Sequence, residues 1–208
     1  MSDRENNQFT FNISLAVLNS LGRNLYRNFI TILGEAISNS WDADANNVKI
    51  SINEEKSEML IIDDGDGMSA SDFSDKFLKI GYSKRVNGAN SQKGRPYIGR
   101  KGIGKLALLS CAKRIIIVTK KSGEPVTGGI IDNNKLDEAI QNDKDHEFYK
   151  LEKLSNEYIK LLDKMEHGTA IKFVNLNNST IRTLEKIRKA IALYFRFSLI
   201  DESFKIYV

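Results

Sequence analysis

A short apolar run that ends in an acidic, glycine-rich turn constrains this chain more than any other feature. Met59-Leu-Ile-Ile62 has the length and composition of a buried β-strand, and Asp63-Asp-Gly-Asp-Gly67 follows it at once. An EF-hand loop counted from Asp64 would place Met68 where an oxygen ligand is required, so a Ca²⁺ loop is excluded. A plain turn remains possible. The alternative is a ligand site in which Asp63 accepts a hydrogen bond from an exocyclic amine, while Gly65 and Gly67 let a flat ring approach.

The stretch 27–41 predicts an amphipathic helix with a second, polar side. Its core stripe follows i, i+3, i+4 spacing and consists of Phe29, Ile32, Leu33, Ala36, Ile37 and Trp41. Glu35, Asn39 and Asp42 gather within roughly 60° on another side of the helix. Such a side is usually only solvated. Here, however, Glu35 is a candidate general base on water, and the amide oxygen of Asn39 suits a hard cation such as Mg²⁺. The small side chain of Ala43 would permit the close approach of a neighbour.

A basic loop between residues 81 and 105 is the third candidate site. It carries seven basic residues and no acid, and it ends in Gly99-Arg-Lys-Gly-Ile-Gly-Lys-Leu106. This run is not a P-loop, because Leu106 replaces the required Ser or Thr and no buried strand precedes it. The glycine order of dinucleotide-binding loops is also absent. Gly99, Gly102 and Gly104 have no side chains and leave the backbone N–H groups accessible just before a predicted helix. Such N–H groups bind phosphate well. A solvated surface loop is the simpler alternative. If the loop binds phosphate, we expect its lysines and arginines to form a mobile lid that counters the phosphate charge.

The order of elements predicts the fold class. We expect helices near 14–21, 27–41 and 70–80, from 104, and at 180–197. Strands are expected near 48–53, 59–63, 114–119, 126–131, 169–174 and 204–208, and a polar, acidic, helical insertion near 132–166. Because helices and strands do not alternate strictly, the prediction is an α/β two-layer sandwich of helices over a mixed sheet.

Four motifs in this order resemble the ATPase domain shared by gyrase B, the ninety-kilodalton heat-shock chaperone, MutL and MORC proteins, the GHKL superfamily. They are E-x-x-x-N-x-x-D-A at Glu35–Ala43, D-x-G-x-G at Asp63–Gly67, G-x-x-G-x-G at Gly99–Gly104, and a late Gly-Thr at Gly168–Thr169. Each motif alone is weak, but four in order are specific. The resemblance spans residues 35–173 and implies the Bergerat ATP-binding fold.

The resemblance implies a role for each candidate residue. Asp63 would bind the adenine amino group, with Thr169 supporting it through an ordered water. Asn39 would hold Mg²⁺, Glu35 would activate water, and Asp42 would support the pocket. The remaining nucleotide-binding candidates are Gly65, Gly67 and Met68 beside the adenine, Ser83 and Lys84 at the start of the lid, and Gly99, Arg100, Lys101, Gly102, Ile103, Gly104 and Lys105 along the phosphates.

Glu35 separates the functions found within the superfamily. Histidine kinases of this fold commonly carry Asn at that position, so a carboxylate favours hydrolysis of ATP by a clamp-type ATPase. His146 lies in the acidic insertion and His167 before the Gly-Thr strand, where we expect an exposed loop position. Two alternatives stay open. One is a kinase-type phosphotransfer domain, and the other is a nucleic-acid-binding module in which the basic loop binds the polyanion and ATP is incidental.

The chain of 208 residues fits one domain. We subdivide it into a possible N-terminal arm at 1–12, an ATP lid at 81–103 and the insertion at 132–166. The resemblance implies ATP-dependent homodimerisation, and it implies a C-terminal transducer or effector region that would make this chain the N-terminal part of a longer protein. A single cysteine, a polar N-terminus and the absence of a long apolar run favour a cytoplasmic protein without a membrane contact. DNA or a client protein are the partners considered.

Overall fold

The computed structural model describes residues 10–11, 29–79, 82, 88–99, 108, 111–141, 149–176, 184–195 and 201–208. The helix expected at 14–21 lies outside these residues. So does the helix expected from residue 104, apart from Leu108, which is helical.

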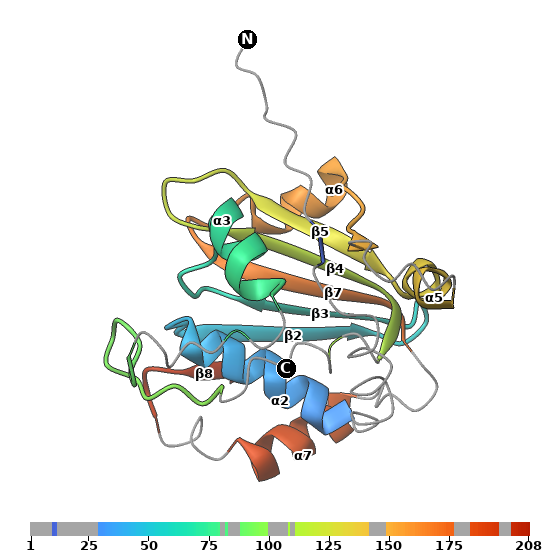
Figure 1. Ribbon diagram of the computed structural model, residues 1–208. Coiled ribbons are helices and arrows are strands. Elements are labelled where there is room, and N and C mark those ends of the chain that lie inside the picture. Colours follow the sequence, from blue (N-terminus) through green and yellow to red (C-terminus); the bar gives the residue numbers. More distant parts are fainter. Residues whose placement is uncertain are drawn as a thin grey trace.

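A six-stranded mixed sheet forms one layer of the molecule (Figure 1). Its strand order is β5-β4-β7-β3-β2-β8, and every neighbouring pair is antiparallel except β2 and β8, which are parallel. The strands are β2 (Asn47–Asn53), β3 (Glu58–Asp63), β4 (Ala112–Lys120), β5 (Thr127–Asp132), β7 (Gly168–Leu176) and β8 (Lys205–Tyr207). The predicted two-layer α/β sandwich with a mixed sheet is therefore confirmed.

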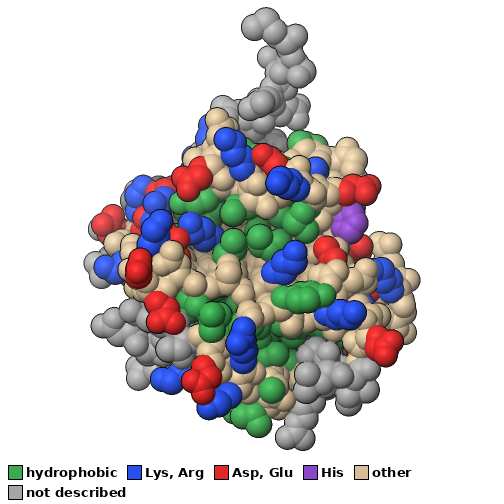
Figure 2. Space-filling model, turned by 180° about the vertical axis from the view of Figure 1, so that it is seen from behind, with side chains coloured by type: hydrophobic (Ala, Val, Ile, Leu, Met, Phe, Trp, Pro, Cys, Tyr) green, Lys and Arg blue, Asp and Glu red, His purple; other side chains and the backbone are tan. Residues whose placement is uncertain are grey.

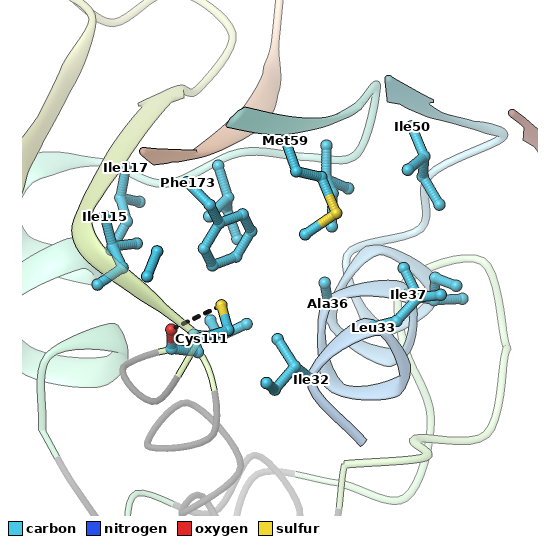
Figure 3. Packing of buried hydrophobic residues seen from close by; sticks show 14 of the residues in the cluster. Ile32, Leu33, Ala36, Ile37, Ile50, Met59, Cys111, Ile115, Ile117 and Phe173 are labelled. Atoms are coloured by element: carbon cyan, nitrogen blue, oxygen red, sulfur yellow. Dashed lines mark hydrogen bonds between the residues drawn. The ribbon is translucent and has the colours of Figure 1, made fainter. Parts of the chain in front are cut away.

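Helices α2 (Phe29–Asp42) and α7 (Leu184–Tyr194) cover one face of this sheet, together with the short α3 (Ala70–Asp72). The stripe residues Ile32, Leu33, Ala36 and Ile37 of α2 pack in one buried cluster with Met59 and Phe173 of the sheet (Figure 3). Cys111 is buried at the edge of the same cluster, and its Sγ lies 3.5 Å from the carbonyl oxygen of Leu108. Cys111 is a core residue, and its burial raises the pKa of the thiol to about 12.

The helix expected near 70–80 has a local irregularity. Ser69 caps α3 by accepting a hydrogen bond from the backbone N–H of Asp72, and the chain then widens into a π-helix, η1 (Phe73–Phe77). The rings of Phe73 and Phe77 stack, with centroids 5.5 Å apart. A π-turn was not predicted because a few residues of apolar spacing do not distinguish it from an α-helix.

The other face of the sheet has a smaller apolar cluster. Ile116, Val118, Ile130 and Ala170 project from it and pack with Leu162 of η3 (Lys160–Leu162), a 3-10 turn that continues α6 (Asn156–Ile159). Seen from behind, apolar side chains occupy the middle of this face, with charged side chains around them (Figure 2). In the part of the chain that is described, no helix is long and apolar enough to cross a membrane.

The described part of the insertion is not wholly helical. It opens with α5 (Asn133–Gln141) and then forms a short strand, β6 (Tyr149–Lys150), before α6. β6 pairs antiparallel with β1 (Thr10–Phe11), the described part of the predicted N-terminal arm. A bridge between Ile130 and Glu152 connects the insertion to β5. The insertion therefore provides the strand with which the arm pairs.

Candidate functional site

Helix α2 positions the first group of candidate residues. Its apolar stripe faces the core, which leaves Glu35 and Asn39 half-buried on a different side, one turn apart. Asp42, at the end of the helix, is 6% exposed. The predicted separation of α2 into a packing stripe and a polar side is therefore present in the structure.

Asp63 lies at the end of the central strand β3 and is only 8% exposed. Its Oδ2 accepts a hydrogen bond from Ser40 Oγ at 2.9 Å, and its Oδ1 accepts one from the Gly65 N–H at 3.0 Å. Burial raises the pKa of Asp63 to about 6, although these two hydrogen bonds work in the opposite direction. The result is a buried carboxylate that is fixed in orientation and costly to leave without a donor.

Ser40 is a site residue that the sequence analysis missed. It is 1% exposed and lies one turn after Ala36, whose carbonyl oxygen is 3.1 Å from Ser40 Oγ. Ser40 thereby connects α2 to Asp63 of β3. A polar residue at an otherwise apolar helical position was the available signal, but its partner is 23 residues away in the sequence.

The other two acids of the turn have separate roles. Asp64 Oδ1 accepts hydrogen bonds from the backbone N–H groups of Asn46 and Asn47, both at 2.7 Å, and Oδ2 accepts one from Asn47 Nδ2. Partial burial works to raise the pKa of Asp64, but these hydrogen bonds hold it below its usual value. Asp66 is exposed. Among the three carboxylates, only Asp63 is buried.

The two glycines of the turn are required by close approaches of the protein's own chain. A Cβ at Gly65 would lie 2.8 Å from the carbonyl oxygen of Ala43, so the small Ala43 does admit a neighbour, and that neighbour is this turn. Gly67 has a φ of 65°, and a Cβ there would overlap the carbonyl oxygen of Lys120. Their approach to an adenine ring stays a prediction.

The hydroxyl groups of two threonines lie across from Asp63 on the next two strands of the sheet. The strand register sets Asp63 opposite Thr169 of β7, and Thr169 opposite Thr119 of β4. Thr119 Oγ1 lies 3.1 Å from Thr169 Oγ1 and accepts a hydrogen bond from the Met68 N–H at 2.9 Å. Thr119 was missed because only the register reveals it. The structure thus brings Asp63, Met68 and Thr169 together, and their contact with adenine stays a prediction.

His167 differs from its sequence-based expectation. We expected an exposed loop position, but the side chain is half-buried and its Nδ1 forms a hydrogen bond with the carbonyl oxygen of Gly65 at 2.7 Å. That expectation was wrong, because the loop before β7 passes beside the acidic turn. His167 therefore helps to fix the turn that carries Asp63.

Asp42 binds the end of the basic loop. Its Oδ1 accepts a hydrogen bond from the Ile98 N–H at 2.8 Å, and its Oδ2 accepts one from the Gly99 N–H at 3.2 Å. The supporting role predicted for Asp42 can thus act through the backbone of this loop. The other candidates of this region lie outside the described residues: Ser83, Lys84, Arg100, Lys101, Gly102, Ile103, Gly104 and Lys105.

Two cations of the basic loop bind the protein itself. Arg95 is 8% exposed, and its guanidinium donates hydrogen bonds to the carbonyl oxygens of Ala45 and Ser203. Lys93 Nζ donates a hydrogen bond to the carbonyl oxygen of Asp44 at 2.8 Å. The expectation that the lysines and arginines of this loop all counter phosphate charge was wrong for Arg95, because its charge is buried among these partners.

The oxygen ligand that this site offers, the amide of Asn39, fits a magnesium ion that is also bound by the phosphates of a nucleotide. No group of three or more His, Cys, Asp or Glu side chains within the described residues could hold a metal ion. Mg²⁺ usually retains several waters and binds one or two protein oxygens together with substrate phosphates. The single amide oxygen of Asn39 is compatible with that pattern, so its assignment as the Mg²⁺ ligand stays a prediction.

Comparisons with known proteins identify a family and relatives to which this chain is similar. The family described as "Histidine kinase-, DNA gyrase B-, and HSP90-like ATPase" matches residues 26–169. A putative type II restriction enzyme, HgiDII of Herpetosiphon aurantiacus, is 33% identical over 195 residues, which are 94% of this chain and 30% of that protein. The chaperone protein HtpG of Rickettsia akari (strain Hartford) is 28% identical over 155 residues, 64% of this chain and 25% of the chaperone. The chain thus spans less than a third of the length of either relative.

Proposed function

Because this chain belongs to the histidine kinase-, DNA gyrase B- and HSP90-like ATPase family, we propose that it binds Mg-ATP and hydrolyses it slowly. The observation that carries the proposal is the buried carboxylate of Asp63, fixed by Ser40 and Gly65 at the end of β3. An ionised carboxylate in this position binds a neutral N–H donor strongly, because charge-assisted hydrogen bonds gain strength away from water.

Adenine recognition is assigned to the residues around Asp63. The carboxylate accepts a hydrogen bond from the exocyclic amino group, and Thr169 supports the base through an ordered water. Met68 is half-buried beside them and its backbone is fixed by Thr119, so it is suited to contact the ring. A guanine base would present a carbonyl oxygen to the carboxylate in place of the amino group, and the site therefore favours adenine.

The phosphate side of the site is assigned to α2 and the basic loop. Asn39 holds Mg²⁺, which neutralises phosphate charge when it is bound. Gly99 begins the G-x-x-G-x-G motif that is proposed to follow the phosphates, and Asp42 fixes its backbone. Asn39 and Asp42 lie on the same helix, so both sides of the phosphate site share one support.

Hydrolysis is assigned to Glu35. Its carboxylate accepts a proton from a water molecule as the water oxygen attacks the γ-phosphorus and the bond to the β-phosphate oxygen breaks. A half-buried carboxylate one turn before Asn39 is suited to orient such a water near the γ-phosphate. The carboxylate favours this reaction over transfer to a histidine of a separate domain.

The longer protein is proposed to act as an ATP-dependent clamp. Two copies would associate when ATP is bound, and the arm containing β1 would exchange its pairing with β6 for one on the partner copy. Because the relative named as a putative restriction enzyme aligns with 94% of the chain, we propose that the clamp acts on DNA in a defence system. A client protein remains the alternative suggested by the chaperone relative.

Calorimetric titration of Mg-ATP into the full chain tests the nucleotide site. We expect Asp63→Asn to weaken binding roughly 10- to 100-fold, the loss expected for one charge-assisted hydrogen bond. Asp66→Asn is the matched control, since it makes the same change in the same turn at an exposed position, and it should alter binding less than about twofold.

Two other outcomes would contradict the proposal. Equal binding by wild type and Asp63→Asn would place the nucleotide elsewhere. No binding by the wild type, together with salt-dependent binding of DNA, would favour the nucleic-acid-binding module.

A further inference from the structure

The segment Gly88–Gly99 folds back on itself and rests against the end of α2. Asn90 and Pro96 form an isolated antiparallel bridge, and the Ser91 N–H donates a hydrogen bond to the Arg95 carbonyl oxygen at 2.8 Å. Trp41 Nε1 of α2 donates a hydrogen bond to the Pro96 carbonyl oxygen at 3.0 Å. This part of the basic loop is therefore attached to the protein over its length.

Asp44 forms the first of two buried attachments. It is 2% exposed and has a φ of 58°, a left-handed conformation that is costly for a residue with a side chain. In this conformation its Oδ1 accepts a hydrogen bond from Ser91 Oγ at 2.6 Å, and its Oδ2 accepts one from the Lys93 N–H at 2.9 Å. The strained backbone thus directs a buried carboxylate at the segment.

Arg95 forms the second attachment. Its guanidinium carbon lies 4.7 Å from the ring centroid of Trp41 and 5.6 Å from that of Phe204. One Nη donates to the carbonyl oxygen of Ala45, and the other donates to the carbonyl oxygen of Ser203 at 2.9 Å. A buried guanidinium with these partners joins the segment to both α2 and the chain before β8.

Ser91 connects the two attachments. Its Oγ donates to Asp44 and also accepts a hydrogen bond from the Arg95 backbone N–H at 3.0 Å. Asp44 and Ala45, just after α2, thus fix the segment Gly88–Gly99. Asp63 itself is bound by a different residue, Ser40 of α2. The hydrogen bonds that Asp44, Ser91 and Arg95 form with one another and with the segment do not reach Asp63.

We propose that Asp44, Ser91 and Arg95 are positioning residues that set Gly99 against α2 and so determine how well the site binds the phosphates of a nucleotide. This inference rests on the proposed function. The three residues do not touch the proposed adenine site, so weakening their connection affects ligands with phosphates and spares adenosine.

Calorimetry on the full chain with Mg-ATP, Mg-ADP and adenosine tests this inference. Ser91→Ala is the mildest variant, because it removes only the hydroxyl that joins Asp44 to Arg95. We expect it to weaken ATP and ADP binding about three- to tenfold while adenosine affinity changes less than about twofold. Ser91→Thr keeps the hydroxyl and should restore ATP binding. Ser155→Ala, an exposed serine without a capping hydrogen bond, is the control for loss of a serine hydroxyl.

Each other outcome overturns the inference in a distinguishable way. If ATP and adenosine weaken equally in Ser91→Ala, the effect is a general loss of folded protein and not positioning. If neither ligand weakens while the wild type binds ATP, the positioning role fails and the proposed function stands. If the wild type binds neither ATP nor adenosine, the proposed function fails with it.

Discussion

If Asp63 binds the adenine amino group as proposed, that binding comes at the expense of the stability of the folded protein. Burial raises the pKa of Asp63 from 3.8 to about 6. Between about pH 4 and pH 6, the folded protein therefore holds a proton on Asp63 that the unfolded chain has lost. The stabilisation from that proton is fully present below about pH 4 and is lost as the pH rises through 6. The difference of about 2 pKa units corresponds to about 3 kcal/mol that the ionised carboxylate costs at neutral pH.

This cost predicts a stabilising substitution. Asp63→Asn removes the buried charge, and its amide can still accept a hydrogen bond from Gly65. Without nucleotide we expect the variant to be about 1–3 kcal/mol more stable than the wild type at pH 7.5, with the gain gone at pH 4. Urea unfolding at the two pH values measures this difference. An equal difference at both would mean that burial does not raise this pKa.

The sequence indicated most of the residues that the structure gathers around Asp63, and it missed those defined by contacts. Thr169 belongs to a motif that can be recognised along the chain, and Met68 directly follows one. Ser40 and Thr119 could not be found in this way, because their relation to Asp63 exists only through helix packing and strand register. Arg95 was misread for the same reason, since its partners Ala45 and Ser203 lie 50 residues before it and 108 residues after it in the sequence.

At the scale of elements, the acidic turn is shaped by the strand beside it. Gly67 and Gly123 both have positive φ values, 65° and 77°. A Cβ at Gly67 would overlap the Lys120 carbonyl oxygen, whereas a Cβ at Gly123, in the turn between β4 and β5, would meet nothing within 4 Å. Substituting each of the two glycines therefore separates the stability cost of a left-handed backbone from the stability cost of steric overlap.

Alanine substitution of these two glycines makes the comparison. Gly123→Ala should lose about 1–2 kcal/mol of stability, the cost of a left-handed backbone for alanine. Gly67→Ala has the same backbone cost, and its new Cβ must also displace β4 or the turn. We therefore expect it to lose at least about twice as much stability as Gly123→Ala. Urea unfolding of both variants measures the difference. Equal losses would show that Lys120 moves aside without cost.

Helices and strands with a clear hydrophobic period were predictable from the sequence, whereas the pairing of very short strands was not. The alternation in β2 and the spacing in α2 gave these elements to within a few residues. The two-residue strands β1 and β6 carry no period, and their pairing depends on bringing together residues 10–11 and 149–150. The strand order of the sheet likewise needs contacts between distant segments, which periodicity does not contain.

At the scale of the whole molecule, hydrolysis and assembly should be coupled if the chain works as a clamp. Within the described residues, β1 and β6 share two residue pairs, and a two-stranded ladder is only marginally stable, which is compatible with the proposed exchange of the arm. ATP that binds the associated form more tightly than the monomer would stabilise the dimer by mass action, and hydrolysis at Glu35 would release it. A variant that binds ATP without hydrolysing it should therefore accumulate as a dimer.

Glu35→Gln tests this coupling, because the amide keeps the shape of the side chain but cannot accept the proton from water. With saturating Mg-ATP, we expect sedimentation velocity to show more dimer for Glu35→Gln than for the wild type, and ATP turnover to fall at least about 100-fold. Glu138→Gln, on the exposed side of α5, is the matched control and should behave as the wild type. Deleting residues 1–12 from Glu35→Gln should abolish the dimer while ATP binding, measured by calorimetry, persists. A monomer at saturating ATP in every variant would exclude the clamp for this chain, whereas a dimer that survives the deletion would place the interface away from the arm.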